Sequence, residues 1–242
     1  MMSQKPPRDA ASAARAESAP VHCHTCRQAI AVYDGISYGS IEAGYRRLCS
    51  RCFNEEIARA GGLDFQHVQF EPVEMRDAAD EWHEFHFRVR LLGDRVALEA
   101  FELSAGEPGG YEFEVIGDPE ADLFELMARL IERMRRALAV RHLKDDDKFG
   151  LRIGDFLVRG RTSCDTEEDE RLPLLVIDGR EVSWGEFGRM LMTFEGWQFR
   201  LEIRDTGVPK GIRTPVTAVK GRCPGPLDDG DADPSRTEME RG

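Results

Sequence analysis

The sequence lacks the marks of a membrane, secreted or nucleic-acid-binding protein. Its longest apolar run covers residues 172–177 and is interrupted by Pro173, whereas a membrane span needs about 18 apolar residues. The first twenty residues hold no apolar stretch typical of a secretory signal. A net charge of −12 over 242 residues leaves no basic footprint for DNA or RNA. We therefore expect a cytoplasmic protein that does not span a membrane, and nucleic acid is an unfavoured partner.

Catalytic motifs are also missing. The chain has no GxSxG segment, P-loop or dinucleotide-binding fingerprint. The segment from His83 to His86 does not match the HExxH motif, and the alternation of apolar residues around it predicts a strand. In a strand these two histidines point to opposite faces and cannot form one site alone. The sequence therefore names no catalytic residue.

Both ends of the chain are poor in core residues. Residues 1–20 are rich in Ala, Ser, Pro and charge, and residues 206–242 are rich in Gly, Pro and Asp, so we expect a disordered arm and a disordered tail. Residues 211–231 back-translate almost codon by codon into the reverse complement of a bacterial glutamate tRNA gene. We interpret this stretch as a reading frame that overlaps such a gene on the opposite strand.

Cysteines are few, but four of the six form two CxxC pairs, CHTC and CSRC, separated by 22 residues. Zinc prefers four tetrahedral thiolate or imidazole ligands, and two CxxC pairs at this spacing supply them. Because all four ligands are cysteines, no coordination position is left for water, so the ion should be structural. The sequence predicts one zinc ion bound by Cys23, Cys26, Cys49 and Cys52.

Two other interpretations of this region remain open. One CxxC pair could be a redox pair, but CHTC lacks the strand and βαβ setting of thioredoxin-like proteins. His22 and His24 flank the first pair, and either could replace a cysteine as a ligand. We favour positions outside the ligand set for both histidines. Pairing as CxxC, rather than as a dispersed disulfide framework, is typical of a reducing cytosol.

The zinc module is predicted to cover residues 21–62 and to resemble a treble-clef finger. Residues 29–33 and 36–38 read as a hairpin that turns at Asp34-Gly35. A helix over residues 51–60 then carries the second cysteine pair on its first turn, where the helix dipole favours thiolates. Gly61 and Gly62 end this helix.

Residues 63–205 are predicted to form an α+β domain with a mainly antiparallel sheet and two helices on one face. One helix starts at Asp118-Pro119 and continues to about Lys144. The other opens with a capping box formed by Ser183 and Glu186, and its Trp184, Phe187, Leu191 and Phe194 share one face. A turn at Asp178-Gly179 closes one hairpin. The predicted strands are 85–91, 96–98, 111–116, 155–161, 174–177 and 197–203.

Arginines recur along one side of the longer predicted helix, at Arg129, Arg133 and Arg136. They could bind a phosphate or an acidic partner. We favour a solvated face that complements the negative end of the helix dipole.

Residues 111–117, 177–184 and 195–199 resemble segments of uncharacterised bacterial proteins with an N-terminal four-cysteine module. The resemblance spans most of residues 21–205, and it implies a fold without an activity.

The leading functional hypothesis is a non-catalytic binding or adaptor protein with a protein partner. An exposed aromatic patch that includes Tyr38 and Tyr45 would support it. One alternative is an enzyme with a pocket in the α+β domain, gathering His83 or His86 with carboxylates. A second alternative is nucleic-acid binding through the zinc module and the arginine face.

Overall fold

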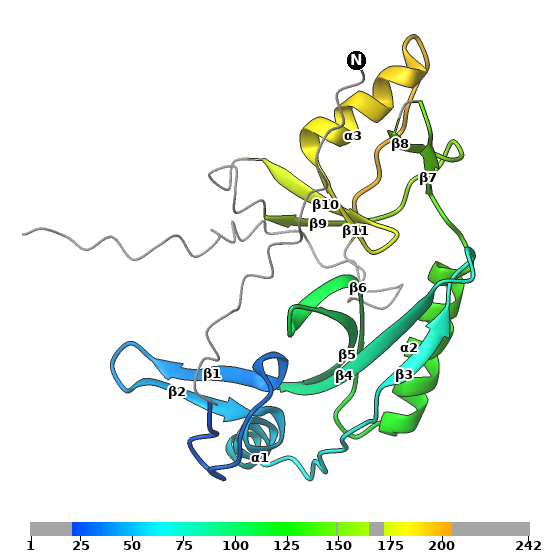
Figure 1. Ribbon diagram of the computed structural model, residues 1–242. Helices are drawn as coiled ribbons and strands as arrows, with labels where there is room; N and C mark the ends of the chain where they lie inside the picture. The colour runs from blue at the N-terminus through cyan, green and yellow to red at the C-terminus, as the bar shows by residue number, and fades with distance from the viewer. Residues whose placement is uncertain (1–20, 149, 165–171, 205–242) are drawn as a thin grey trace, which may run out of the picture.

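The computed structural model describes residues 21–148, 150–164 and 172–204, which form three parts with separate hydrophobic clusters (Figure 1). The N-terminal module packs around Leu48, the central domain around Phe85 and Leu130, and the C-terminal unit around Ile177 and Val182. Every strand pair among the described residues is antiparallel, and the α+β class is confirmed. The predicted arm and tail, including residues 211–231, lie outside the described residues.

The hairpin of the N-terminal module differs from the predicted one. Residues 32–34 form a short 3-10 helix, and the chain reverses at residues 41–43 instead of at Asp34-Gly35. The reason lies upstream, where Ile30 N–H donates to Val21 O and Ala29 pairs with His22. Residues 29–30 are thus already paired with the start of the module. Its elements are η1 Val32–Asp34, β1 Gly35–Ser40, β2 Gly44–Cys49 and α1 Ser50–Gly61.

The helix predicted at residues 51–60 is confirmed as α1, and Gly62 ends it in the left-handed region at φ 65°. Ile57 and Ala58 on this helix also pack against the cluster of the central domain. One helix therefore contributes to two cores, and Ile57 packs against both.

The central domain is a four-stranded sheet in the order β3-β4-β5-β6. The predicted hairpin around Gly93-Asp94 and the third strand are confirmed, and β3 is an additional edge strand. Asn54 and α1 lie at the part of β4 that β3 does not cover. The strands are β3 Val73–Arg76, β4 Trp82–Leu92, β5 Arg95–Ser104 and β6 Glu107–Gly117.

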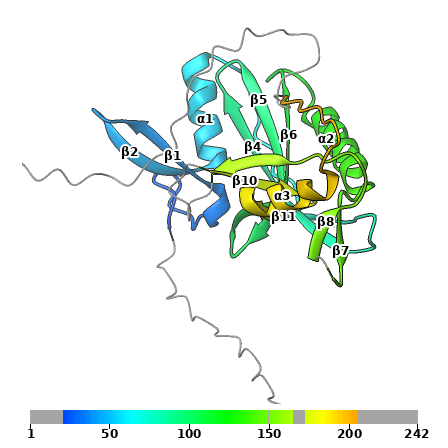
Figure 2. The same ribbon diagram turned by 90° about the horizontal axis from the view of Figure 1, so that it is seen from above.

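Two helices pack on one face of this sheet. One is α2 Leu123–Leu138, which was predicted there, and the other is α1 in place of the second predicted helix. The predicted helix near Ser183 packs in the C-terminal unit instead. That unit contacts β6, where Arg161 pairs with Glu112, and it is drawn in front of the sheet in Figure 2.

The long helix is shorter than predicted at both ends. Asp118 accepts from Glu120 N–H in a turn, and Asp122 is the residue that caps the helix, by accepting from Phe124 N–H. Beyond Ala139 the chain leaves the helix, because the Asp178 carboxylate binds two successive N–H groups there and holds them extended. The next elements are β7 Leu143–Asp146 and β8 Gly150–Ile153.

The C-terminal unit confirms the Asp178-Gly179 turn and the capping box of Ser183 and Glu186. Residues 155–160 and 197–203 form no strand, so these two predictions are wrong except at residue 161, where the next strand begins. The alternation was present at both places, but within the described residues neither 155–160 nor 197–203 pairs with a neighbouring strand. The elements are β9 Arg161–Cys164, β10 Pro173–Ile177, β11 Arg180–Ser183, α3 Trp184–Leu191 and η2 Met192–Phe194.

The buried face of this last helix also differs in part from the predicted one. Phe187 and Phe194 pack against the cluster, but Trp184 and Leu191 are exposed. Met190 is the buried residue of the helix.

Candidate metal centre

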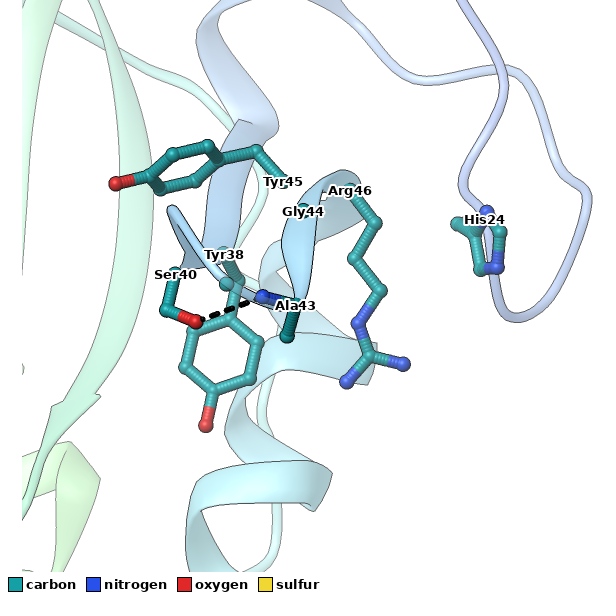
Figure 3. Close-up of a pocket in the computed structure, with 8 residues that line it drawn as sticks. His24, Tyr38, Ser40, Ala43, Gly44, Tyr45 and Arg46 are labelled. Carbon is teal, nitrogen blue, oxygen red and sulfur yellow. Dashed lines mark hydrogen bonds between the residues drawn. The ribbon is translucent and has the colours of Figure 1, made fainter.

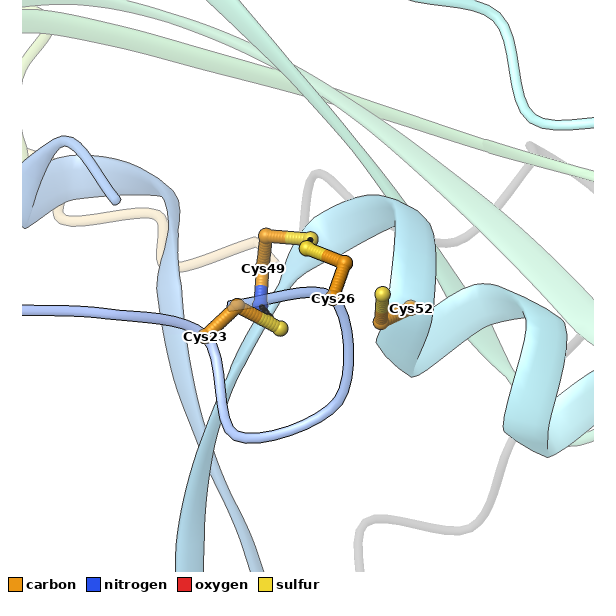
Figure 4. A group of neighbouring side chains, drawn as sticks. All are labelled: Cys23, Cys26, Cys49 and Cys52. Atoms are coloured by element: carbon orange, nitrogen blue, oxygen red, sulfur yellow. Dashed lines mark hydrogen bonds between the residues drawn. The ribbon is translucent and has the colours of Figure 1, made fainter. Parts of the chain in front are cut away.

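The first cysteine pair sits in a tight backbone loop. Cys23 N–H donates to Gln28 O, and Arg27 N–H donates back to Cys23 O. Arg27 has a φ of 63°, which gives the chain the left-handed residue that such a reversal requires. Both sulfur atoms of this pair therefore project from one side of the loop (Figure 4).

The second pair lies where β2 passes into α1. Cys49 is the N-cap residue of the helix and Cys52 is in its first turn. The backbone N–H of Cys49 lies 3.4 Å from Cys23 Sγ, so the start of the helix also donates to the first pair. Unpaired N–H groups and the positive end of the helix dipole favour thiolates at this position.

The four sulfur atoms have the spacing of a single metal site. All lie within 4.8 Å of one another, and Cys26 Sγ is 3.9 Å from Cys49 Sγ. Two thiolates about 2.3 Å from a tetrahedral zinc ion are about 3.8 Å apart, whereas a disulfide bond is about 2.05 Å. The four cysteines are free thiols, with Cys23 and Cys52 buried. The arrangement is therefore compatible with metal binding.

Without a metal, the four thiols cannot all ionise easily. Burial acts to raise the pKa of Cys23, but backbone N–H groups, including those of Cys26 and Cys49, lower that pKa to about 6. Burial raises the pKa values of Cys49 and Cys52. The thiolate of Cys23 is thus favoured while Cys49 and Cys52 are held protonated, so a cation is needed to stabilise four thiolates together.

Arg51 is the positive side chain beside this cluster. Its hydrogen bond to Cys26, together with the nearby sulfur charges, raises its pKa. His22 and His24 are exposed and do not belong to the sulfur cluster. A four-thiolate ligand set therefore needs no imidazole.

A residue that the sequence did not single out connects this centre to the central sheet. Asn54 is fully buried, and its side chain bonds the backbone of β4 at two points, 2.8 Å to Val89 O and 2.7 Å from Leu91 N. Its amide also lies 2.9 Å from His67 Nδ1. Because the amide nitrogen is the donor, His67 Nδ1 is the acceptor and the ring is neutral. The helix that carries Cys52 is thereby fixed to the sheet.

The arginine face of α2 is not one continuous positive strip. The Arg133 guanidinium donates to Glu114 O at 2.7 Å, and its pKa is lowered by burial. Arg136 pairs with Glu132 of the same helix. Among the predicted three, Arg129 and Arg136 are exposed while Arg133 is turned toward the sheet.

The two predicted tyrosines do not form one patch. A hollow of about 600 Å³ surrounds the β1–β2 hairpin and includes Tyr38, Tyr45 and Arg46 in its lining. Tyr38 and Tyr45 project to opposite faces of the hairpin (Figure 3). Tyr38 packs edge-on against Phe53 of α1, while Tyr45 is 67% exposed. The hollow is therefore not a single aromatic binding pocket.

Three family models match successive parts of the chain, and each describes a domain of unknown function. Residues 22–64 match DUF7685, residues 66–139 match DUF7686 and residues 142–207 match DUF7713. No curated protein and no solved structure matches the chain. In the described part of the chain, no helix is long and apolar enough to cross a membrane. These similarities assign no reaction to any part of the chain.

Proposed function

We propose that the chain is a non-catalytic binding protein stabilised by one structural zinc ion on Cys23, Cys26, Cys49 and Cys52. The observation that carries the proposal is the closed donor set, because four thiols at tetrahedral spacing leave no position for a reacting water. A loop with two ligands, a hairpin, and a helix with the other two resemble a treble-clef finger.

The proposed ion acts by holding the N-terminal loop against α1. The module has a small core of five buried residues, of which two are the ligands Cys23 and Cys52. So small a core is marginal without a metal or a similar constraint. Through Asn54, the same helix is bonded to β4. Zinc therefore stabilises both the module and its attachment to the central sheet.

The surface that best fits a protein partner lies on the C-terminal unit. Residues 197–203 carry an alternating row that we call the C-terminal apolar strip: Trp197, Phe199, Leu201 and Ile203. These side chains are 64–89% exposed, and Phe156 stacks on Trp197 at 5.3 Å between ring centroids. Exposed apolar patches of this kind mark interaction sites.

The backbone of the strip supports the same proposal. The segment has the apolar and polar alternation of a strand but belongs to no sheet among the described residues. A segment of this kind can pair with a strand of another protein, which would cover its apolar side chains and satisfy its backbone groups. We therefore propose a partner protein that presents a sheet edge bordered by apolar residues.

The test compares two double variants of the full chain. Phe199→Asp with Ile203→Asp changes the apolar face of the strip, and Arg200→Ala with Glu202→Ala changes its polar face. Proteins retained by the wild-type chain in its native host are identified, purified and titrated calorimetrically against all three forms. We expect a negative heat capacity change for binding and at least about a tenfold loss of affinity for the apolar-face variant alone.

Equal loss in both variants, or no loss in either, would remove the strip from the proposal. Zinc is measured on the same preparations by elemental mass spectrometry after dialysis. One tightly held zinc per chain is expected, and reversible disulfides in place of zinc would favour a redox role.

A single observation favours the enzyme alternative: His83 lies among acidic side chains, with Asp77 and Glu102 in contact. The adjoining hollow measures about 360 Å³ and includes Glu102 in its lining. This volume is within the ordinary range for ligand pockets, but the surface of the hollow is mainly polar, whereas ligand pockets are mostly lined by apolar side chains. We therefore rank binding above catalysis.

A further inference from the structure

The turn between β3 and β4 is held by one buried carboxylate. Asp77 Oδ1 accepts from Ala79 N–H at 2.8 Å and from Glu81 N–H at 2.9 Å, while the side chain is only 6% exposed. Ala78 N–H donates to Leu138 O at the end of α2, so the turn is also fixed from outside (Figure 1). The second oxygen of Asp77 lies on the side of His83, 3.7 Å from its Nε2.

The orientation of His83 is set from its other nitrogen. Nδ1 lies 2.7 Å from Glu102 Oε1, and a carboxylate can only accept, so Nδ1 carries the proton. Glu102 is held in turn by Tyr111 N–H, which donates to Oε2 at 2.7 Å. In the neutral ring, Nε2 then presents a lone pair. Within the described residues this buried atom has no hydrogen-bond partner.

The distance between Nε2 and Asp77 does not fit a hydrogen bond. Nitrogen–oxygen hydrogen bonds in proteins are about 2.7–3.2 Å long, and 3.7 Å is well beyond them. Two ligands about 2.1 Å from a tetrahedral ion are about 3.4 Å apart. The gap is thus close to that between two atoms that bind one metal ion.

The charges around the gap favour a cation. Three carboxyl groups, those of Asp77, Glu81 and Glu102, surround His83, against one guanidinium, Arg141, which is 3.8 Å from Glu81. Burial acts to raise the pKa of Asp77, but the N–H groups of Glu81 and Ala79 lower it, with smaller effects from Arg141 and from His83 when that ring is protonated. The nearby Arg76 pairs with Asp80 and packs over a tryptophan ring, so it adds no positive contact to the cluster.

From this geometry we propose that Asp77, Glu81 and His83 bind one divalent transition-metal ion, in a second site separate from the four cysteines. One ligand atom from each residue lies within 4.8 Å of the other two. One imidazole and two carboxylates suit zinc or manganese better than calcium, which prefers oxygen alone. The Glu81 side chain is 56% exposed, so water completes the coordination.

Glu102 acts as a positioning residue in this site. A histidine ligand commonly donates its second N–H to a carboxylate, and loss of that contact weakens metal binding about 10–100-fold. Glu102 and Tyr111 also lie against the Asp178-Gly179 turn of the C-terminal unit. The approach is so close that a Cβ atom added to Gly179 would lie 2.8 Å from the Tyr111 ring. An ion here therefore joins the β3–β4 turn to the contact between two parts of the chain.

The test uses the full chain with its cysteine site already loaded with zinc, and further Zn²⁺ as the probe. Zinc bound is counted by equilibrium dialysis with elemental mass spectrometry, and ¹⁵N-histidine NMR reports the protonation of each ring nitrogen. His83→Gln removes the nitrogen ligand. Asp77→Asn replaces Oδ2 but keeps an oxygen for the two turn N–H groups. His86→Gln is the matched control, because His86 is on the opposite face of the same strand and contacts Glu84.

We expect one additional zinc per chain and a shift of the His83 Nε2 resonance on titration. The additional zinc and the resonance shift should be lost in His83→Gln and Asp77→Asn and kept in His86→Gln. In Glu102→Gln the affinity for the additional zinc should fall about tenfold or more. A doubly protonated His83 with no additional zinc would overturn the proposal and show an ion pair with Asp77. Additional zinc that survives in both ligand variants would overturn it as well, by showing adventitious binding.

Discussion

Asn54 offers the sharpest test of how the metal module is attached to the central sheet. β3 pairs with β4 only from Trp82 to Phe85, so the backbone at Val89 and Leu91 has no strand on that side. The Asn54 side chain occupies this edge and satisfies one C=O and one N–H group. In Asn54→Ala both groups stay buried without partners, at about 1–3 kcal/mol each, so unfolding should become easier by about 2–6 kcal/mol.

The measurement is guanidinium unfolding of the zinc-loaded chain, combined with hydrogen exchange at the Leu91 amide. The lower limit, about 2 kcal/mol, corresponds to about 30-fold faster exchange, since each 1.4 kcal/mol is a factor of ten. Glu55→Gln, on the exposed side of the same helix, is the control and should change neither quantity. A variant at Asn54 within about 1 kcal/mol of the wild type, with Leu91 still protected, would refute the reasoning.

Three further predictions test the metal site, a half-buried histidine and a helix cap. Cys52→Ser should lose the tightly bound zinc and melt at a lower temperature than the zinc-loaded wild type, as seen by calorimetry; a chain that keeps its zinc would contradict the ligand assignment. Burial lowers the pKa of His67 in the folded state, so the unfolded chain binds more protons below pH about 6.5. The stability contribution of His67 is thus fully present above that pH and is lost as the pH falls through the lower folded pKa. In His67→Gln the free energy of unfolding, measured in urea over a pH series, should depend less on pH in this range. An unchanged pH dependence would contradict the prediction. Ser183→Ala removes the cap that accepts from Glu186 N–H and should cost about 1 kcal/mol in urea unfolding, whereas Ser183→Thr should restore most of it.

Local sequence signals predicted those elements whose stabilising contacts lie within a few residues. The two CxxC pairs, the turn at Asp178-Gly179 and the capping box of Ser183 with Glu186 all appear as expected. Each depends on short-range geometry that the residue types themselves impose. The same holds for the β4–β5 hairpin, where a positive φ at Gly93 serves a tight turn.

Predictions failed where a distant partner decides the conformation. Residues 197–203 alternate like a strand, but a strand requires a neighbour, and the described part of the chain supplies none. The long helix stops early because Asp178 binds the N–H groups of His142 and Leu143, which are 36 and 35 residues away in the chain. The predicted hairpin at residues 29–38 gave way to pairing of residues 29–30 with residues 21–22.

The sequence by itself determined the four-cysteine cluster and the α+β class, because residue type, residue spacing and apolar periodicity are local properties. Only the tertiary structure decided that α1 shares two cores, that Asn54 completes the edge of β4, and that His83 faces Asp77 across 3.7 Å. These contacts join residues far apart in the chain. They are fixed by how the sheet, helices and turns pack, and no pattern in a single stretch of sequence records that packing.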